Sequence, residues 1–215
     1  MHAVGIVTVV AAIVAAGAMA GNWWSRWRDR RDVELITKPL ATIAIAALAL
    51  SVSDDAPAGA VIAALIGFGF CLAGDVALLP AIDRFVIGLG AFLVGHVAFV
   101  VMFIELGVTE RVLAGIALAG VIGVAWLLGR RIVAGAARRD ATLATPVRAY
   151  LLVISTMGVV GWATGLPAAI VGSTLFVASD SVLGWGQFVR EQRWMPVAIM
   201  ATYHGALLGL ALSLA

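Results

Sequence analysis

Apolar stretches of similar length, separated by short polar connections, follow one another along the whole chain. A helix needs about 20 apolar residues to cross the ~30 Å hydrocarbon core of a bilayer. Eight stretches meet or nearly meet that length, at 3–21, 36–52, 58–79, 85–106, 111–129, 147–163, 166–188 and 195–214. The pattern predicts an all-α membrane bundle of eight transmembrane helices that forms a single domain over residues 1–215.

The composition supports the bilayer as the solvent of this chain. Of its 215 residues, 63% are hydrophobic and only 12% are charged, whereas soluble domains carry about 25% charged residues. The net charge of +2 comes from short basic clusters beside the apolar stretches, which indicates membrane topology and no nucleic-acid partner. Cys71 is the single cysteine, so no disulfide can form within the chain.

The positions of the basic residues predict an orientation in the membrane. Eleven of the 14 Lys and Arg residues lie in the first, third, fifth and seventh connections between stretches. Cytoplasmic loops are enriched in Lys and Arg, so we expect an inner or plasma membrane protein with both termini outside. The first basic cluster follows the first stretch, which argues against a cleaved signal peptide. Tryptophans near the same side are interpreted as interface anchors: Trp23, Trp24, Trp27, Trp185 and Trp194.

Polar side chains inside the apolar stretches define a candidate site. Charged groups in a membrane are expensive and usually face the bundle interior or a water-filled cavity. At 1.5 Å of rise per residue, those found here lie between the cytoplasmic interface and the midplane, except Glu105 at the outer end. This shared depth predicts one polar cavity open to the cytoplasmic half, although separate Lys38–Asp75 and Arg148–Asp180 ion pairs would give the same pattern. The cavity residues are Lys38, Asp75, His96, Arg148, Tyr150, Asp180, Tyr203 and His204.

The two halves of the chain share a spacing of polar residues. Ala73-Gly74-Asp75 matches Ala178-Ser179-Asp180. In each half a basic residue opens the helix before the Asp and a His lies in the helix after it: Lys38 and His96, then Arg148 and His204. An offset of four helices makes the repeat parallel, so we expect a 4+4 arrangement with the site between the halves.

Two carboxyl groups in a low-dielectric cavity suit acid–base hydrolysis. Their surroundings can keep one protonated while a nearby cation keeps the other ionised. The acid can then donate a proton to an acetal-like or enol-ether bond, and the carboxylate can stabilise the resulting cation or direct water onto it. We expect Asp75 and Asp180 to form this catalytic pair.

Other chemistries have less support from the spacing of residues. The serines near Asp180 lack the G-x-S-x-G elbow of many serine hydrolases. A zinc site built from Asp75, Asp180 and the two histidines is chemically feasible, but no H-E-x-x-H or H-x-x-x-H spacing accompanies it. The chain also has no phosphate loop of the Walker type. The sequence therefore predicts neither a metal nor a cofactor.

Short motifs in a fixed order span most of the chain. The most specific is Gly172–Asp180, which reads G-S-T-L-F-V-A-S-D. Together the motifs resemble the YhhN-like lysoplasmalogenase family of membrane proteins, whose pattern G-A-x-x-F-x-x-S-D is broken here only at Ser173. The other matching pieces are Lys38-Pro39, Gly74-Asp75 with Leu78-Leu79, Gly88, Phe92, Gly95-His96 and Tyr150. In the last helix the family's Tyr followed by Ala-Gln is replaced by Tyr203-His204-Gly205-Ala206, so His204 is a candidate for the missing polar group.

The resemblance implies hydrolysis of the vinyl ether of a lysoplasmalogen, giving a fatty aldehyde and a glycerophospho-ethanolamine or -choline. Under this hypothesis Asp75 and Asp180 are the acid–base pair, and Lys38 and Arg148 meet the phosphate head group. The substrate is then a lysophospholipid or ether lipid taken from the surrounding membrane lipids. The remaining substrate-binding candidates are His96, Tyr150, Ser179, Tyr203 and His204.

Two alternative functions fit the same polar residues. A small proton-coupled transporter would also place Asp, Lys and His at mid-membrane. A lipid-binding membrane protein with a degenerate site is the second alternative. A carrier needs access from both sides, whereas the polar residues here serve the cytoplasmic half, which favours the enzyme.

Overall fold

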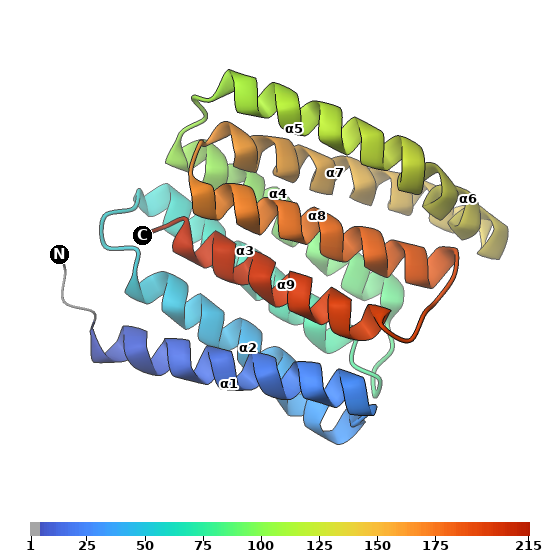
Figure 1. Cartoon of the computed structure of the whole chain (residues 1–215), viewed down its shortest axis with the longest axis horizontal. Helices are drawn as coiled ribbons and strands as arrows, with labels where there is room; N and C mark the ends of the chain where they lie inside the picture. The colour runs from blue at the N-terminus through green and yellow to red at the C-terminus, as the bar shows by residue number, and fades with distance from the viewer. Residues whose placement is uncertain (1–4) are drawn as a thin grey trace.

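Helices account for every regular element in residues 5–215, the part of the chain that this computed structural model describes (Figure 1). Two of these elements are not α-helical, since η1 is a π-helix and η2 is a 3-10 helix. The elements are α1 (Ile6–Arg28), α2 (Arg31–Ser51), α3 (Ala58–Ala77), α4 (Phe85–Leu106), α5 (Arg111–Val124), η1 (Ala125–Gly129), α6 (Arg130–Arg139), η2 (Ala141–Leu143), α7 (Ala144–Ala163), α8 (Pro167–Phe188) and α9 (Met195–Leu212).

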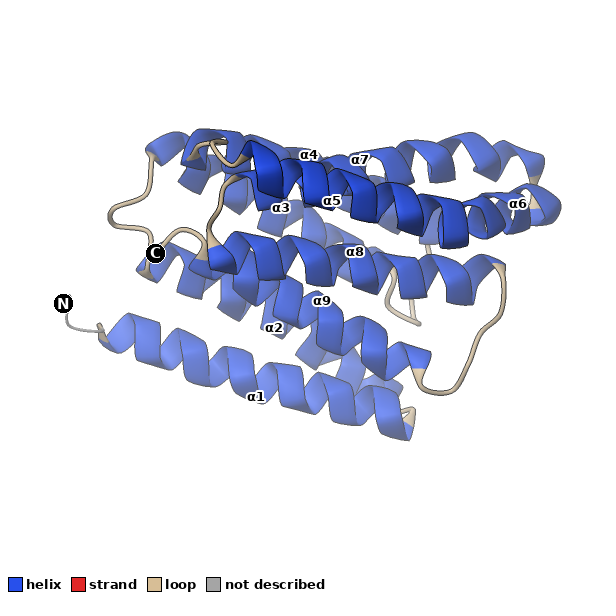
Figure 2. Cartoon of the chain, turned by 45° about the horizontal axis from the view of Figure 1, so that its top comes forward, coloured by secondary structure: helices blue, strands red, loops and turns tan. Residues whose placement is uncertain are grey.

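Eight helical segments in the described residues are long and apolar enough to cross a bilayer, with 111–139 and 141–163 each counted as one span. The chain is therefore a multi-pass helical membrane protein, and the predicted fold class is confirmed. The connections gather at the two ends of the bundle (Figure 2). The start of α1 and the end of α9 share one end (Figure 1). We call the opposite one the basic end, because it carries Arg26, Arg28, Arg30, Arg31, Arg84, Arg138, Arg139, Arg190 and Arg193.

The first connection is much shorter than the sequence predicts. The apolar stretches end at 21 and resume at 36, but α1 continues to Arg28 and α2 begins at Arg31. Long basic side chains can reach the interface from a helix end, so loss of hydrophobicity does not end the helix. Asp29 ends α1 by adopting a left-handed conformation (φ 52°), and the Arg30 N–H donates to the Ser25 carbonyl at 2.8 Å.

The fifth span is likewise longer than predicted. The sequence predicts a helix over 111–129 followed by a basic loop, whereas the helix runs through π-helical η1 to Arg139. Asp140 then breaks the helix, and its carboxylate accepts hydrogen bonds from the Thr142 N–H at 2.9 Å and hydroxyl at 2.7 Å. These bonds hold the pKa of the Asp140 carboxyl below its usual value.

Glycines lie where the helices approach one another most closely. Small residues are usual at such contacts in membranes, because lipid is as apolar as the helix surfaces and the hydrophobic effect does not drive the helices together. At the α8–α9 crossing, a Cβ built on Gly172 would lie 2.8 Å from the backbone nitrogen of Leu210. A Cβ on Gly209 would lie 2.6 Å from the Cα of Gly172. Both obstacles are backbone atoms, so this crossing cannot accept a larger residue by moving a side chain. It fixes α9 against α8.

Several helix neighbours fit the expected 4+4 pattern, but not all of them do. The pair α3–α4 corresponds to α8–α9, and these two pairs pack extensively. Between the halves, α4 packs on α7 and its counterpart α9 packs on α2. By contrast, α1 packs on α9, whereas no comparable contact joins their counterparts α5 and α4 within residues 5–215. Superposition of α2–α4 on α7–α9 remains the direct test of the repeat.

We predict that Gly172→Ala lowers the stability of the folded protein by about 1–3 kcal/mol, because the added methyl group overpacks a backbone–backbone contact. Thermal unfolding in detergent measures this change. The matched control is Gly90→Ala on α4, where a Cβ meets no atom within 4 Å. Equal unfolding temperatures for the two variants would contradict the proposed role of the α8–α9 crossing.

Candidate active site

A cavity of about 200 Å³ opens near the basic end between helices of both halves. Asp75 of α3 and Asp180 of α8 both line it, although they lie 105 positions apart in the chain. Both apolar and charged side chains form its wall. Its lining consists of Arg26, Glu34, Lys38, Asp75, Leu78, Asp83, Phe85, Phe92, Ser179, Asp180, Leu183, Gln187, Pro196, Ile199, Met200 and Tyr203.

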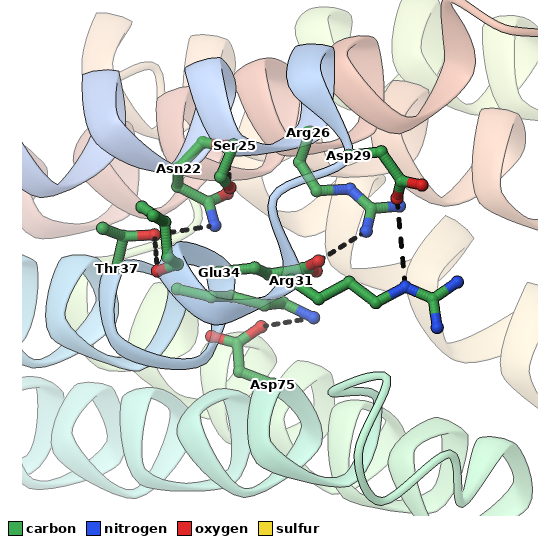
Figure 3. A network of polar contacts seen from close by, with 10 residues as sticks. Asn22, Ser25, Arg26, Asp29, Arg31, Glu34, Thr37 and Asp75 are labelled. Atoms are coloured by element: carbon green, nitrogen blue, oxygen red, sulfur yellow. Dashed lines mark hydrogen bonds and ion pairs between the residues drawn. The ribbon is translucent and has the colours of Figure 1, made fainter.

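Asp75 is a fully buried carboxyl group held by three neighbours. The Lys38 Nζ lies 3.6 Å from its Oδ1, and this ion pair is drawn at the foot of the network in Figure 3. The Thr42 hydroxyl donates to Oδ2 at 2.5 Å, and the Tyr203 hydroxyl donates to the same oxygen at 2.9 Å. One cation and two hydroxyl donors favour the ionised carboxylate by charge and hydrogen bonding.

Asp180 has a different environment. The Tyr150 hydroxyl donates to its Oδ2 at 2.5 Å, and the His96 Nε2 lies 3.5 Å from the same oxygen. His96 is itself fully buried, with the rings of Phe176 and Tyr150 packed edge-on against it. The Asp180–His96 pair can hold one proton on either partner without changing its total charge. Asp180 is therefore suited to give and take a proton.

The two carboxyl groups have equivalent sets of contacts, each made with one helix of the same half of the chain and one helix of the other half. Each receives a hydroxyl group from the helix before it, Thr42 of α2 or Tyr150 of α7. Each also contacts the last helix of the other half, through Tyr203 of α9 or His96 of α4. Each half of the chain thus contributes one side chain to the carboxyl group of the other half, which is what the repeat hypothesis predicts.

His204 lies behind this site on α9 and is fully buried. Its Nδ1 accepts a hydrogen bond from the Trp23 Nε1 at 3.0 Å. When neutral, the imidazole must then carry its proton on Nε2. That atom has no hydrogen-bond partner among residues 5–215. Ser179, on the cavity wall, instead joins α8 to α9 by donating to the Ile199 carbonyl at 3.1 Å.

The structure brings together seven of the nine residues expected at the site, while His204 lies behind it and Arg148 lies outside it. Lys38 is engaged with Asp75, so it is not a free cation for a phosphate group. Arg148 lies on an exposed face of α7 and does not line the cavity. Of the two ion pairs considered from sequence, Lys38–Asp75 forms, whereas the described contacts of Asp180 are with Tyr150 and His96.

Several contributors to the site carry no strong signal in the sequence. Thr42 is one small polar residue in an apolar helix, although its position one turn after Lys38 places both on the same face of α2. Trp23 is read from sequence as an interface anchor, but its indole also binds His204. Arg26 pairs with Glu34 at 2.7 Å in the polar network between α1 and α2 (Figure 3).

No group of three or more His, Cys, Asp or Glu side chains within residues 5–215 converges on a point that could hold a metal ion.

Comparison with known proteins identifies the family to which the chain belongs. The YhhN family model matches residues 33–214, which is most of the chain. The chain belongs to the YhhN family. The matched region contains α3 and α8, and so both buried aspartates of this family member.

Relatives of this YhhN protein carry an enzyme name. The rat protein named lysoplasmalogenase TMEM86B is 30% identical over 158 residues, which cover 74% of this chain and 64% of the relative. Proteins named lysoplasmalogenase from Mycobacterium bovis and Mycobacterium tuberculosis are each 31% identical over 134 residues, covering 57% of this chain and 48% of the relative. The chain thus spans between about half and two thirds of the length of these relatives. No solved structure matches it.

We predict that Lys38→Met destabilises the protein by about 3–5 kcal/mol, because it leaves a buried carboxylate without its cation. The double variant Lys38→Met/Asp75→Asn should lose less than the sum of the two single losses. Thermal unfolding of the four proteins in detergent gives this coupling.

The matched control is Arg28→Met, which removes an exposed basic residue at the end of α1. It should change stability by less than about 0.5 kcal/mol. Additive losses in the Lys38 and Asp75 cycle would show that the two groups are not coupled.

Proposed function

We propose that this YhhN-family protein is a membrane lysoplasmalogen hydrolase in which Asp75 and Asp180 perform acid–base catalysis. The observation that carries the proposal is that two buried carboxyl groups with unequal surroundings line one cavity. The enzyme name of its relatives supports the same reaction class.

The different surroundings of Asp75 and Asp180 support different roles for them in catalysis. Asp75 has an ammonium group and two hydroxyl donors, so we assign it as the carboxylate that acts as general base. Asp180 has Tyr150 and the His96 imidazole, so we assign it as the proton donor. Two carboxyl groups whose surroundings differ in this way can act as one acid and one base at the same pH.

The reaction then balances with water as the only co-reactant. The Asp180 carboxyl donates its proton to the vinyl carbon on the chain side, and the C=C electron pair forms the new C–H bond. The carbon attached to oxygen becomes an oxocarbenium centre. Water adds to that carbon as Asp75 takes its proton.

The resulting hemiacetal breaks its bond to the glycerol oxygen. Its hydroxyl proton passes to that oxygen, which leaves the fatty aldehyde and the glycerophospho product. Transfer of the proton on Asp75 back to Asp180 restores the starting state. A saturated alkyl ether has no C=C bond to protonate, so the same site cannot hydrolyse it by this route.

The charge distribution supports one orientation of the protein in the membrane. The cavity opens near the basic end, and clusters of Lys and Arg mark the cytoplasmic side of membrane proteins. We therefore propose that the substrate enters from the cytoplasmic leaflet and that both termini lie outside. This polarity also agrees with a cavity that serves one side of the membrane.

Asp75→Asn and Asp180→Asn are each expected to lower aldehyde release from lysoplasmenyl-ethanolamine by about 10²-fold or more, because each removes proton transfer. The assay uses purified protein in detergent, with the saturated 1-alkyl lysolipid as an unreactive substrate. Asp54→Asn, an exposed carboxyl at the opposite end of the bundle, should retain activity. Full activity of either active-site variant would remove the proposed mechanism.

A cysteine-labelling experiment tests the orientation. Cys71 is buried and is replaced by Ala, after which Ala215→Cys or Arg139→Cys introduces one exposed thiol. In intact cells a membrane-impermeant maleimide should label Ala215→Cys, and Arg139→Cys only after permeabilisation. The reverse labelling pattern would invert the proposed topology.

A further inference from the structure

Two basic side chains of the described residues line the cavity that holds the two aspartates, and they differ in how accessible they are. Lys38 is buried against Asp75, so turning it toward a ligand would leave a buried carboxylate without its cation. Arg26 lies two residues before the end of α1, at the basic end, and 27% of its side chain is exposed. A negatively charged group that enters the cavity can therefore be bound by Arg26.

The guanidinium group of Arg26 keeps donors available for such a ligand. It carries five N–H donors, and its Nη1 donates to the Glu34 carboxylate at 2.7 Å (Figure 3). Its Nε and Nη2 form no hydrogen bond within residues 5–215. Guanidinium groups bind phosphate oxygens through two parallel N–H bonds. Glu34 thus orients Arg26 and leaves it able to bind a phosphate group.

Asp83 is an exposed carboxylate on the lining of the same cavity. It lies in the connection between α3 and α4, where its backbone is left-handed (φ 47°) and its N–H donates to the Leu79 carbonyl at 2.9 Å. Its side chain forms no ion pair in the part of the chain that the structure describes. Asp83 and Arg26 also both line a polar hollow of about 490 Å³ at the basic end. Two opposite charges therefore lie at this end of the site.

The ion pairs leave the cavity lining with an excess of negative charge. Its two basic side chains are each paired with a carboxylate, so those charges cancel. The carboxylate of Asp83 adds a negative charge that no cation offsets within residues 5–215. An acidic head group would be repelled by this charge, whereas a head group with a phosphate and an ammonium group matches both Arg26 and Asp83.

We infer that Arg26 and Asp83 form a head-group site, in which the guanidinium binds the phosphodiester of a lysophospholipid and the carboxylate binds its terminal ammonium group. The inference rests on the proposed function for the identity of the lipid. Asp180 lies eight residues before the end of α8, which is about 12 Å along the helix from the basic end. The glycerol unit separates the ether bond from the phosphate, so a lipid that reacts at Asp180 directs its head group toward Arg26 and Asp83.

Binding of saturated ether lipids, which are not hydrolysed, tests the amine contact on the purified protein in detergent. The ligands are two 1-alkyl lysolipids with the same chain, one carrying phosphoethanolamine and the other phosphoglycerol. Asp83→Asn removes the charge and keeps a residue type that accepts a left-handed backbone. The matched control is Asp29→Asn, since Asp29 is also exposed and left-handed (φ 52°) at the basic end but does not line the cavity.

The unsubstituted protein should prefer the phosphoethanolamine ligand, and Asp83→Asn should lower that preference about fivefold, the loss expected for an exposed ion pair. Asp29→Asn should retain the preference. An equal preference in Asp83→Asn and the unsubstituted protein would overturn the amine contact, and so would an equal loss in Asp29→Asn.

The phosphate contact is tested by comparing Arg26→Gln/Glu34→Gln with Glu34→Gln alone, because neither variant leaves the Glu34 carboxylate without its cation. The double variant should bind both lysolipids about tenfold more weakly than the single variant, because charge-assisted hydrogen bonds to the phosphate are lost. Both variants should bind 1-alkylglycerol, which has no phosphate, with equal affinity. Equal affinity of the two variants for the lysolipids would overturn the phosphate contact.

Two further measurements identify the occupant and separate this site from the proposed reaction. Diacyl phosphatidylethanolamine should displace the 1-alkyl lysolipid only weakly, and displacement as strong as by unlabelled lysolipid would overturn the lysolipid as occupant in favour of a bilayer lipid. Absence of aldehyde release from lysoplasmenyl-ethanolamine by the unsubstituted protein, with the binding shifts present, would overturn the proposed reaction and leave the head-group site.

Discussion

A charge buried among membrane helices must be paired, and the Lys38–Asp75 ion pair meets that constraint in this protein. The pair joins α2 to α3, and the Tyr203 hydroxyl brings α9 onto the same carboxylate. Removing any one partner leaves a polar group in a low-dielectric interior, which is more costly than the contact itself is favourable. The relative positions of three helices are therefore tied to one carboxylate, and the cavity beside it forms as a result.

The second carboxyl group lies in surroundings unlike those of the first. In the expected 4+4 repeat Asp180 corresponds to Asp75, and both receive hydroxyl groups from the preceding helix. The difference is the partner: an ammonium group for Asp75 and an imidazole for Asp180. Lys38 lies on α2 and His96 on α4, so the two carboxyl groups differ in which neighbouring helix supplies the basic side chain.

The sequence predicts well how deep each polar residue lies in the membrane, but it does not predict which face of its helix the residue occupies. Counting residues along each span is sufficient to place Asp75, His96, Asp180 and Tyr203 in one half of the membrane. Arg148 has the same depth, yet it lies on an exposed face of α7, because a helix that is apolar on most sides does not reveal which face is inside. Helix ends are also poorly predicted, since basic residues extend α1 and α6 beyond the hydrocarbon core.

The position of α1 bears on how such a site diversifies. The family match begins at residue 33, after α1 has ended, yet Trp23 and Arg26 of α1 contact His204 and the cavity. The helix that completes the wall thus lies outside the region that the family model matches, whereas α3 and α8, which hold the two carboxyl groups, lie inside it. A change in this one helix can therefore alter the wall of the cavity without altering the helices that hold the two carboxyl groups.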